Sequence, residues 1–186
     1  MKKEKKYAVV GVSGSGKSTM LKILANLLND YHGEVVFDEQ CREKPIYLDQ
    51  DTTILDGSIL ENVLFGQTCT NERLIQISEA IGLNEVVGRQ PQNWGTEIAK
   101  GKNLSRGQEQ RICLARCLIK EADTYLLDEA TSNIDVVDED KIMKALIGNQ
   151  GILEEKTVLI STHKLSMIDY VDEVIYIKMD GFIKDT

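Results

Sequence analysis

Three features of the sequence predict an α/β fold with a mainly parallel sheet. Short apolar runs, which are typical of buried strands, alternate with longer segments whose apolar residues recur at helical spacing. A glycine-rich stretch joins the first apolar run to the first helical segment, and a pair of acidic residues ends a later apolar run. Because parallel strands present functional residues at their carboxyl ends, these features predict a functional site at one edge of the sheet.

The composition is that of a globular protein. Its 186 residues suit a single domain over 1–186, with 42% hydrophobic and 28% charged residues. The net charge of −8, without a dense basic block beyond residues 1–6, disfavours binding to nucleic acid. No apolar run approaches the roughly 18 residues of a membrane span, so we expect a cytosolic chain. Cys113 and Cys117, four apart on an expected helix, favour buried core residues over a metal site or disulfide.

The glycine-rich stretch over residues 11–19 carries the first chemical signal. It fits the pattern G-x-x-x-x-G-K-[ST], follows the strand expected at 7–10 and opens the helix expected at 17–29. Backbone N–H groups in such a loop surround phosphate, Lys17 reaches the β- and γ-phosphates, and the Ser18 hydroxyl holds Mg²⁺. We therefore expect a nucleoside triphosphate to contact Gly11, Ser13, Gly14, Ser15, Gly16, Lys17, Ser18 and Thr19.

The next part of the chain predicts a small β-subdomain and then a helical lobe over about 57–120. Two short strands are expected at 34–37 and 46–48, and they would form a reduced antiparallel subdomain ahead of Gln50. The first expected helix has an apolar stripe of Ile59, Leu60, Val63 and Leu64. The second covers 72–81, stops at Gly82, and turns inward Leu74, Ile75, Ile77 and Ile81.

A further helix is expected to start after an aperiodic loop at 89–103. Ser105 suits its N-cap, and Gln108 stands three residues on, where a capping box needs a glutamine or glutamate. The N-terminus of a helix attracts anions, so this start is a candidate second phosphate site. By itself the pattern also fits an ordinary capped surface helix.

The acidic pair closes the apolar strand expected at 124–128. Asp128 would lie at the carboxyl end of that strand, placed for Mg²⁺, with Glu129 placed for an attacking water. Another strand expected at 157–161 leads to His163 on the same side. The remaining expected elements are a helix at 136–147 and a terminal hairpin of strands at 174–177 and 182–184.

The order of these motifs resembles the nucleotide-binding domain of ATP-binding cassette (ABC) transporters, and within them the exporters. The matching pieces, which run from about residue 7 to 184, are the P-loop, Gln50, Leu-Ser-Arg-Gly-Gln at 104–108, Leu-Leu-Asp-Glu at 126–129, Ser-Asn-Ile-Asp at 132–135 and His163. The stretch at 104–108 is the specific one, because many ATPases share the P-loop and the acidic strand end. The resemblance implies a P-loop NTPase core that binds ATP and Mg²⁺ and hydrolyses ATP to power transmembrane export.

The resemblance also implies roles for individual residues. Glu129 would be the general base, Gln50 would contact Mg²⁺ or the lytic water beside Asp128, and His163 and Lys17 would hold the γ-phosphate. Two such domains would meet head to tail, so that one chain's signature closes on nucleotide held by the other. The residues expected at that junction are Ser105, Gly107, Gln108 and Asp135. Transmembrane domains would be the other partners, at the cytoplasmic face of the cell membrane.

Several positions depart from the family pattern. Arg106 stands where the family usually has the first signature glycine, and Ala99 and Lys100 stand where exporters often carry a glutamate. The interval between the P-loop and Gln50 is short for an exporter. Only residues 1–6 precede the first expected strand, where the family has further strands and an aromatic residue that stacks on adenine. The abrupt start and the absence of a membrane span favour a piece of a larger transporter over a separate subunit.

Two alternative functions follow from the same residues. One is a non-hydrolytic, ATP-dependent switch or interaction module. The other is a soluble ABC ATPase without a transport role, such as a DNA-repair or chromosome-organising relative, which would carry long coiled-coil arms. The sequence contains no heptad run between the P-loop and the signature, and its intact set of acids and His163 favours hydrolysis.

Overall fold

The computed structural model describes residues 1–36, 44–51, 53–99, 103–178 and 181–184. The chain divides into two compact units. The sheet unit comprises Met1–Gln50, Ala122–Ala130 and Leu153–Thr186, and the helical unit comprises Asp51–Glu121 and Thr131–Ile152. The predicted α/β class with a mainly parallel sheet is confirmed. Among the described helices, none is both long enough and apolar enough to cross a membrane.

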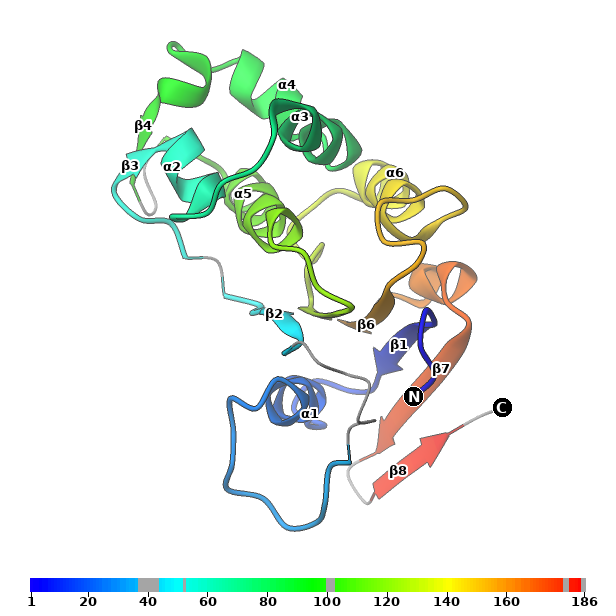
Figure 1. Ribbon diagram of the computed structural model, residues 1–186. Helices are drawn as coiled ribbons and strands as arrows, with labels where there is room; N and C mark the ends of the chain where they lie inside the picture. The colour runs from blue at the N-terminus through cyan, green and yellow to red at the C-terminus, as the bar shows by residue number, and fades with distance from the viewer. Residues whose placement is uncertain (37–43, 52, 100–102, 179–180, 185–186) are drawn as a thin grey trace. The chain divides into compact units, whose positions relative to one another are not determined.

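The sheet unit is built on one six-stranded sheet (Figure 1). Its strand order is β2-β5-β6-β1-β7-β8, and all neighbours are parallel except the final antiparallel pair. The strands in that order are β2 (Ile46–Leu48), β5 (Thr124–Asp128), β6 (Thr157–Thr162), β1 (Lys6–Val10), β7 (Glu173–Lys178) and β8 (Gly181–Lys184). The carboxyl ends of β1, β2, β5 and β6 therefore share one edge, where the predicted site residues begin.

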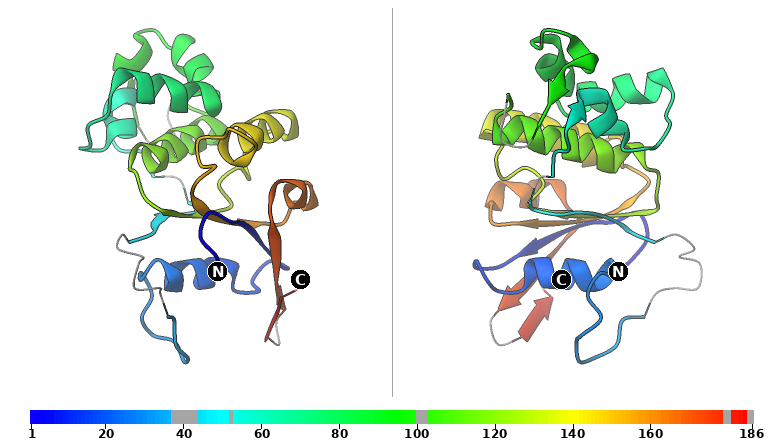
Figure 2. Two further views of the ribbon diagram at one scale, coloured as in Figure 1. Left: turned by 45° about the vertical axis from the view of Figure 1, so that its right-hand side comes forward. Right: turned by 90° about the vertical axis from the view of Figure 1, so that its left-hand side faces the viewer.

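Helix α1 (Lys17–Leu24) packs along one face of this sheet (Figure 2). The helix contributes Leu21 to an apolar cluster with Tyr7, Val9, Leu126, Leu159 and Ile177 from four strands. The short 3₁₀ helix η2 (Leu165–Tyr170) follows β6. The prediction that the first helix runs to residue 29 was wrong, because the helix ends at Leu24 and Asn26 adopts a left-handed conformation at φ 56°.

The helical unit surrounds the buried helix α5 (Arg106–Ile119), which has ten buried residues. Helices α2, α3 and α4 each contact α5, and α3 also contacts α6. A two-stranded antiparallel sheet pairs β3 with β4. The remaining bounds are β3 (Gly57–Ser58), α2 (Ile59–Leu64), α3 (Asn71–Ala80), α4 (Leu83–Gly88), η1 (Asn93–Gly95), β4 (Glu97–Ile98) and α6 (Val136–Ile147).

Part of the predicted β-subdomain was wrong. Residues 34–36 form no strand, and Phe37 and most of the polar stretch after it lie outside the described residues. The strand at Ile46–Leu48 exists, but it pairs in parallel with β5 in the main sheet. An isolated two-stranded pair is only marginally stable in water, whereas a short strand at the edge of a larger sheet shares the hydrophobic face of that sheet. The small antiparallel sheet of the structure is instead β3 with β4.

The predicted helical lobe was also incomplete in detail. Gly82 does end the helix before it, yet its left-handed conformation at φ 64° also caps α4, a helix that the sequence did not reveal. Ile75 was expected to face inward but is 56% exposed, because the buried side of α3 is set by Ile77 and Ser78. The expected loop at 89–103 contains η1 and β4.

Cys113 and Cys117 are buried free thiols as expected, and burial raises the pKa of Cys117 to about 12.

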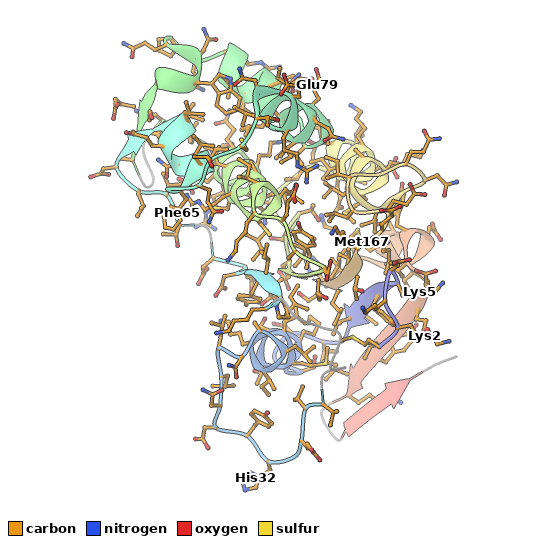
Figure 3. All side chains as sticks on the ribbon, in the orientation of Figure 1. Lys2, Lys5, His32, Phe65, Glu79 and Met167 are labelled. Carbon is orange, nitrogen blue, oxygen red and sulfur yellow. The ribbon has the colours of Figure 1, made fainter. Side chains whose placement is uncertain are left out.

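The start of β1 is fixed to β7 by one carboxylate. Asp172 accepts a hydrogen bond from Lys5 Nζ at 2.6 Å and another from the Lys6 backbone N–H at 2.8 Å (Lys5 is labelled in Figure 3). Partial burial works to raise the pKa of Asp172, but these two hydrogen bonds and the positive charges of Lys5 and Lys6 together outweigh it and hold the pKa below its ordinary value. The ionised carboxylate therefore stabilises the strand that leads into the P-loop.

We expect Asp172→Asn to lower the free energy of unfolding at pH 7 by about 0.5 to 1 kcal/mol, since the pair is partly exposed. Because the pKa of Asp172 is lower in the folded state than in the unfolded chain, the ionised carboxylate stabilises the fold at pH values above the unfolded pKa of about 4. This contribution disappears as the pH falls through the folded pKa. Urea denaturation at pH 7 and at pH 3 measures the difference in the free energy of unfolding between the variant and the unmodified chain. The control is Asp169→Asn, which makes the same charge change where the described structure records no hydrogen bond or ion pair. An equal loss in both variants would contradict the assignment.

Candidate functional site

The P-loop joins β1 to α1 through a backbone that depends on glycine. A Cβ at Gly11 would approach the Ile177 carbonyl oxygen and the Ser15 Oγ to 2.6 Å, so no larger residue fits without movement. Gly14 and Gly16 have φ values of 77° and 99°, which side chains with a Cβ rarely adopt. The loop predicted from the pattern therefore has a physical need for each of these three glycines.

Polar groups in this loop suit an anion. Gly16 caps α1 without a side-chain hydrogen bond, so the first N–H groups of that helix have no side-chain partner at the cap. Lys17 is 7% exposed, and its ammonium donates to the carbonyl oxygens of Gly11 at 2.9 Å and Val12 at 3.2 Å. The Ser15 hydroxyl is buried and has no hydrogen-bond partner among the described residues. Phosphate oxygens are the natural acceptors for such a set of donors.

Two predicted residues contact Glu129 at the carboxyl edge of the sheet. Gln50, just after β2, donates from Nε2 to the Glu129 Oε2 at 3.1 Å. His163, just after β6, places its Nδ1 3.7 Å from the Glu129 Oε1. Glu129 itself has φ 46°, an unfavourable value for glutamate, and its N–H donates to the Ser161 carbonyl at 3.2 Å. Strain of this kind gathers at functional sites, and here it coincides with the residue whose carboxylate contacts Gln50 and His163.

Asp128 is fully buried and is held by two hydroxyl groups. Ser161 on β6 donates to the Asp128 Oδ1, and Tyr47 on β2 donates to the Oδ2 at 3.0 Å. The sequence analysis did not identify either donor. A serine within the apolar run that forms β6 was an available signal for the first. Tyr47 offered none, because its proximity to Asp128 depends on β2 lying beside β5.

The residues at this edge suit an ion such as Mg²⁺, which completes its coordination with water and phosphate, better than a metal ion held by protein ligands alone. Among the described residues, no group of three or more His, Cys, Asp or Glu side chains could hold a metal ion. Mg²⁺ commonly takes one or two protein oxygens and completes its shell with water and substrate phosphate. A buried carboxylate at Asp128 and a hydroxyl at Ser18, in the first turn of α1, are donors of that kind.

The second group of predicted residues lies in the helical unit at the start of α5. Ser105 and Gln108 form the predicted capping box: Ser105 Oγ accepts from the Gln108 N–H at 3.3 Å, and the Gln108 Oε1 accepts from the Ser105 N–H at 2.8 Å. A Cβ at Gly107 would come within 2.7 Å of the Asn133 carbonyl oxygen. The Asn133 N–H in turn donates to the Gln110 Oε1 at 2.9 Å, so the loop before α6 is fastened to α5.

A cavity of about 440 Å³ opens at this helix start. Ser105, Gly107, Gln108 and Asp135 all line it, together with charged residues of α3, α4 and α6, among them Glu79, labelled in Figure 3. Asp135 itself caps α6, because its Oδ1 accepts from the Asp138 N–H at 3.1 Å. All four predicted signature residues are therefore gathered around one concave surface of the helical unit.

Arg111 supports the wall of this cavity. Its guanidinium donates to the Ile81 carbonyl and forms an ion pair with Asp138 at 2.6 Å. Burial works to raise the pKa of Asp138, but the hydrogen bonds and positive charges of Lys141 and Arg111 outweigh it and lower the pKa. The cavity thus combines a helix N-terminus with a wall in which Asp138 pairs with Arg111 and Lys141.

Comparison with known proteins supplies independent information. A family model described as ABC transporter matches residues 1–132. The chain is 36% identical over 97% of its length to the mesentericin-Y105 transport/processing ATP-binding protein MesD of Leuconostoc mesenteroides. It is 34% identical over 99% of its length to the lactococcin-A transport/processing ATP-binding protein LcnC of Lactococcus lactis. It is also 34% identical over 94% of its length to the ABC transporter ATM1 of Toxoplasma gondii. The chain spans 26%, 27% and 16% of these relatives' own lengths.

The close approach at Gly107 generates a prediction. Gly107→Ala should lower the free energy of unfolding by about 1 to 3 kcal/mol, because the new methyl group displaces the Asn133 carbonyl. Alanine has a higher helix propensity than glycine, so propensity alone would predict a more stable variant. Gly88→Ala is the matched control: it lies at the end of α4 with nothing within 4 Å of an added Cβ and should be neutral or stabilising. Guanidinium denaturation compares the two, and a stable Gly107→Ala variant would refute the packing argument.

Proposed function

The chain belongs to the ABC transporter family, and from this we propose that it is the nucleotide-binding domain of an exporter, binding and hydrolysing ATP to power transport. The observation that carries the proposal is the carboxylate of Glu129, which is contacted by both Gln50 and His163 at the sheet edge where the P-loop begins. A base held between two polar side chains, beside a loop suited to phosphate, is arranged for an attack by water on a γ-phosphate. We further propose that residues 1–186 act as one such domain, with a helical lobe over about 57–120.

ATP would be held mainly through its phosphates. The N–H groups of the P-loop and of the first turn of α1 would surround the β-phosphate, and Ser15 would find a partner for its buried hydroxyl there. Lys17 would exchange its two carbonyl acceptors for phosphate oxygens. Asp128, Ser18 and Gln50 would hold Mg²⁺, which neutralises charge on the β- and γ-phosphate oxygens when it is bound.

Glu129 would take the proton from the attacking water. Gln50 keeps the carboxylate oriented in the described structure, and it can pass its amide hydrogen bond to the same water. His163 is 58% exposed and would donate a hydrogen bond to the γ-phosphate while it remains near Glu129. Lys17 would stabilise the negative charge on the transferred phosphoryl group. This division gives each predicted catalytic residue a distinct task.

A second copy of the chain would complete the site. Ser105, Gly107 and Gln108 surround a helix N-terminus, which favours negative charge, and Asp135 lines the same cavity. We propose that these residues meet the γ-phosphate held by the P-loop of a partner chain in a head-to-tail dimer. Arg106 is exposed in the first turn of α5 and would add a positive charge to that approach.

Transmembrane domains would be the remaining partners. The relatives named above are called transport ATP-binding proteins, or an ABC transporter, and this chain corresponds to about a quarter or less of each. We therefore propose that the chain works at the cytoplasmic face of a membrane, coupled to spanning segments that select the cargo.

Glu129→Gln should retain ATP binding and lose steady-state turnover by about 10² to 10⁴-fold, because glutamine cannot accept the proton of the attacking water. It should also stabilise a nucleotide-bound dimer. Phosphate release and size-exclusion chromatography with Mg-ATP measure the two effects. Glu155→Gln, an exposed glutamate away from the site, is the control and should behave as the unmodified chain. Undiminished phosphate release by Glu129→Gln would remove Glu129 from the proposed mechanism.

The proposed two-chain site predicts that ATP turnover depends on protein concentration. Phosphate release per chain should rise with concentration until the dimer is saturated, since each nucleotide needs residues from two copies. A dilution series at saturating Mg-ATP measures this rate. A rate per chain that stays constant across the series would mean that a single chain contains the whole catalytic site.

A further inference from the structure

Both oxygens of the buried Asp128 carboxylate accept hydrogen bonds from neutral hydroxyl groups, one on each neighbouring strand. Ser161 comes from β6 and Tyr47 from β2, and all three side chains lie on the sheet face that α1 covers. We propose that Ser161 and Tyr47 are positioning residues that hold Asp128 and Glu129 in the geometry needed for the metal-bound nucleotide. This inference rests on the proposed function, because it concerns how the same site binds Mg-ATP.

Ser161 connects the two acids directly. Its hydroxyl donates to the Asp128 Oδ1 and accepts the Glu129 backbone N–H at 3.0 Å, while its own carbonyl accepts the same N–H at 3.2 Å. The residue is fully buried, so no water replaces these contacts. Asp128 and Ser161 are also register partners across the β5–β6 ladder. A single side chain therefore sets the carboxylate of one acid and the backbone of the next.

The backbone of Glu129 needs this support. A glutamate at φ 46° pays a conformational cost, and such a conformation persists only where neighbouring groups fix it. The two acceptors on Ser161 are what the Glu129 N–H finds in that conformation. Removal of the hydroxyl would take away one of the two recorded acceptors of the Glu129 N–H, and we expect the Glu129 carboxylate to move from Gln50 and His163.

The neutrality of the two donors matters for Asp128. Among the described residues, no recorded ion pair includes Asp128, and its two recorded hydrogen-bond donors are uncharged hydroxyl groups. A carboxylate has about four lone-pair positions, and the hydroxyls occupy two of them. The remaining positions keep their full attraction for a cation. Hydroxyl donors thus orient the carboxylate without competing with Mg²⁺ for its charge.

Tyr47 extends the arrangement to β2. Its hydroxyl lies 3.0 Å from the Asp128 Oδ2, and its strand continues within three residues to Gln50, which contacts Glu129. Lys22 of α1 places its ammonium 6.0 Å from the centre of the Tyr47 ring and pairs with Asp49 at 3.3 Å. Tyr47 therefore has neighbours on both β5 and α1. Asp128 accepts hydrogen bonds from β6 and from β2.

The test compares nucleotide binding with and without metal. A fluorescent ATP analogue is titrated into the 186-residue chain in Mg²⁺ and in EDTA, for the unmodified chain, Ser161→Ala and Tyr47→Phe. We expect the affinity in Mg²⁺ to fall about 10-fold in each variant, at the lower end of the range for residues that orient metal ligands. The affinity in EDTA should stay within about twofold, because the P-loop contacts to phosphate are untouched.

Two controls remove buried hydroxyls elsewhere. Ser78→Ala deletes a serine hydroxyl that donates to the Leu74 carbonyl at 2.6 Å within α3, and Tyr125→Phe deletes a tyrosine hydroxyl on β5 that accepts the Ala122 N–H at 3.3 Å. Both should lower the denaturation midpoint without changing the ratio of the two affinities. If they reproduce the loss in Mg²⁺, the effect is general loosening and the proposal is wrong.

The outcomes separate this inference from the proposed function. An unmodified chain that binds the analogue neither in Mg²⁺ nor in EDTA overturns both. An unmodified chain that gains affinity from Mg²⁺, with variants that keep the whole gain or lose affinity equally in EDTA, overturns only the positioning roles. Should Ser161→Ala fail to fold, Tyr47→Phe decides alone, because it removes one atom and keeps the ring contacts.

Discussion

The parallel register of three adjacent strands is the constraint on which the candidate site depends. Ser161 on β6 stands opposite Asp128 on β5 and opposite Val9 on β1, so the acids and the beginning of the P-loop reach the same sheet edge. A slip of one residue would turn Asp128 to the other face, away from Ser161 and Tyr47. The apolar cluster beneath α1 opposes such a slip, because Leu126 and Leu159 of this cluster lie two residues before Asp128 and Ser161 and therefore on the same face. Packing in the core thereby fixes chemistry at the edge.

Hydrogen bonds between side chains and the backbone fix the candidate site residues of the helical unit. The capping box at Ser105 fixes where α5 begins, and Gln110 and Gly107 hold the loop before α6 against that first turn. The wall formed by Arg111 and Asp138 keeps its charges paired. The N-terminus of α5 can then present its positive end to a ligand beside an arginine whose charge is already paired.

Most of the site could be predicted from the sequence because its signals are local. The P-loop spacing, the capping box at Ser105 and the acids at the end of β5 each depend on residues a few positions apart, and the structure contains each of them. The errors arose where distant segments decide. Strand β2 was expected in a small subdomain, yet its pairing with β5 is set by tertiary contacts. Helix α4 is only six residues long, too short for a clear periodicity. The roles of Ser161 and Tyr47 follow from strand order, which no local pattern contains.

The residues that break local rules gather at one edge of the sheet unit. Glu129 adopts a left-handed conformation, Ser15 keeps a buried hydroxyl without a described partner, and Asp128 is buried beside neutral donors. The strained Glu129 backbone and the buried Ser15 hydroxyl, which has no partner among the described residues, each cost about 1 to 3 kcal/mol relative to an ordinary alternative, so their coincidence is improbable unless function favours it. A bound triphosphate with its metal would satisfy the hydroxyl and the carboxylate together. The strained backbone would meanwhile keep the Glu129 carboxylate turned toward the attacking water. On this argument the stability lost at the sheet edge would be recovered when a nucleotide and its metal bind, because the Ser15 hydroxyl and the remaining lone pairs of Asp128 would then gain partners.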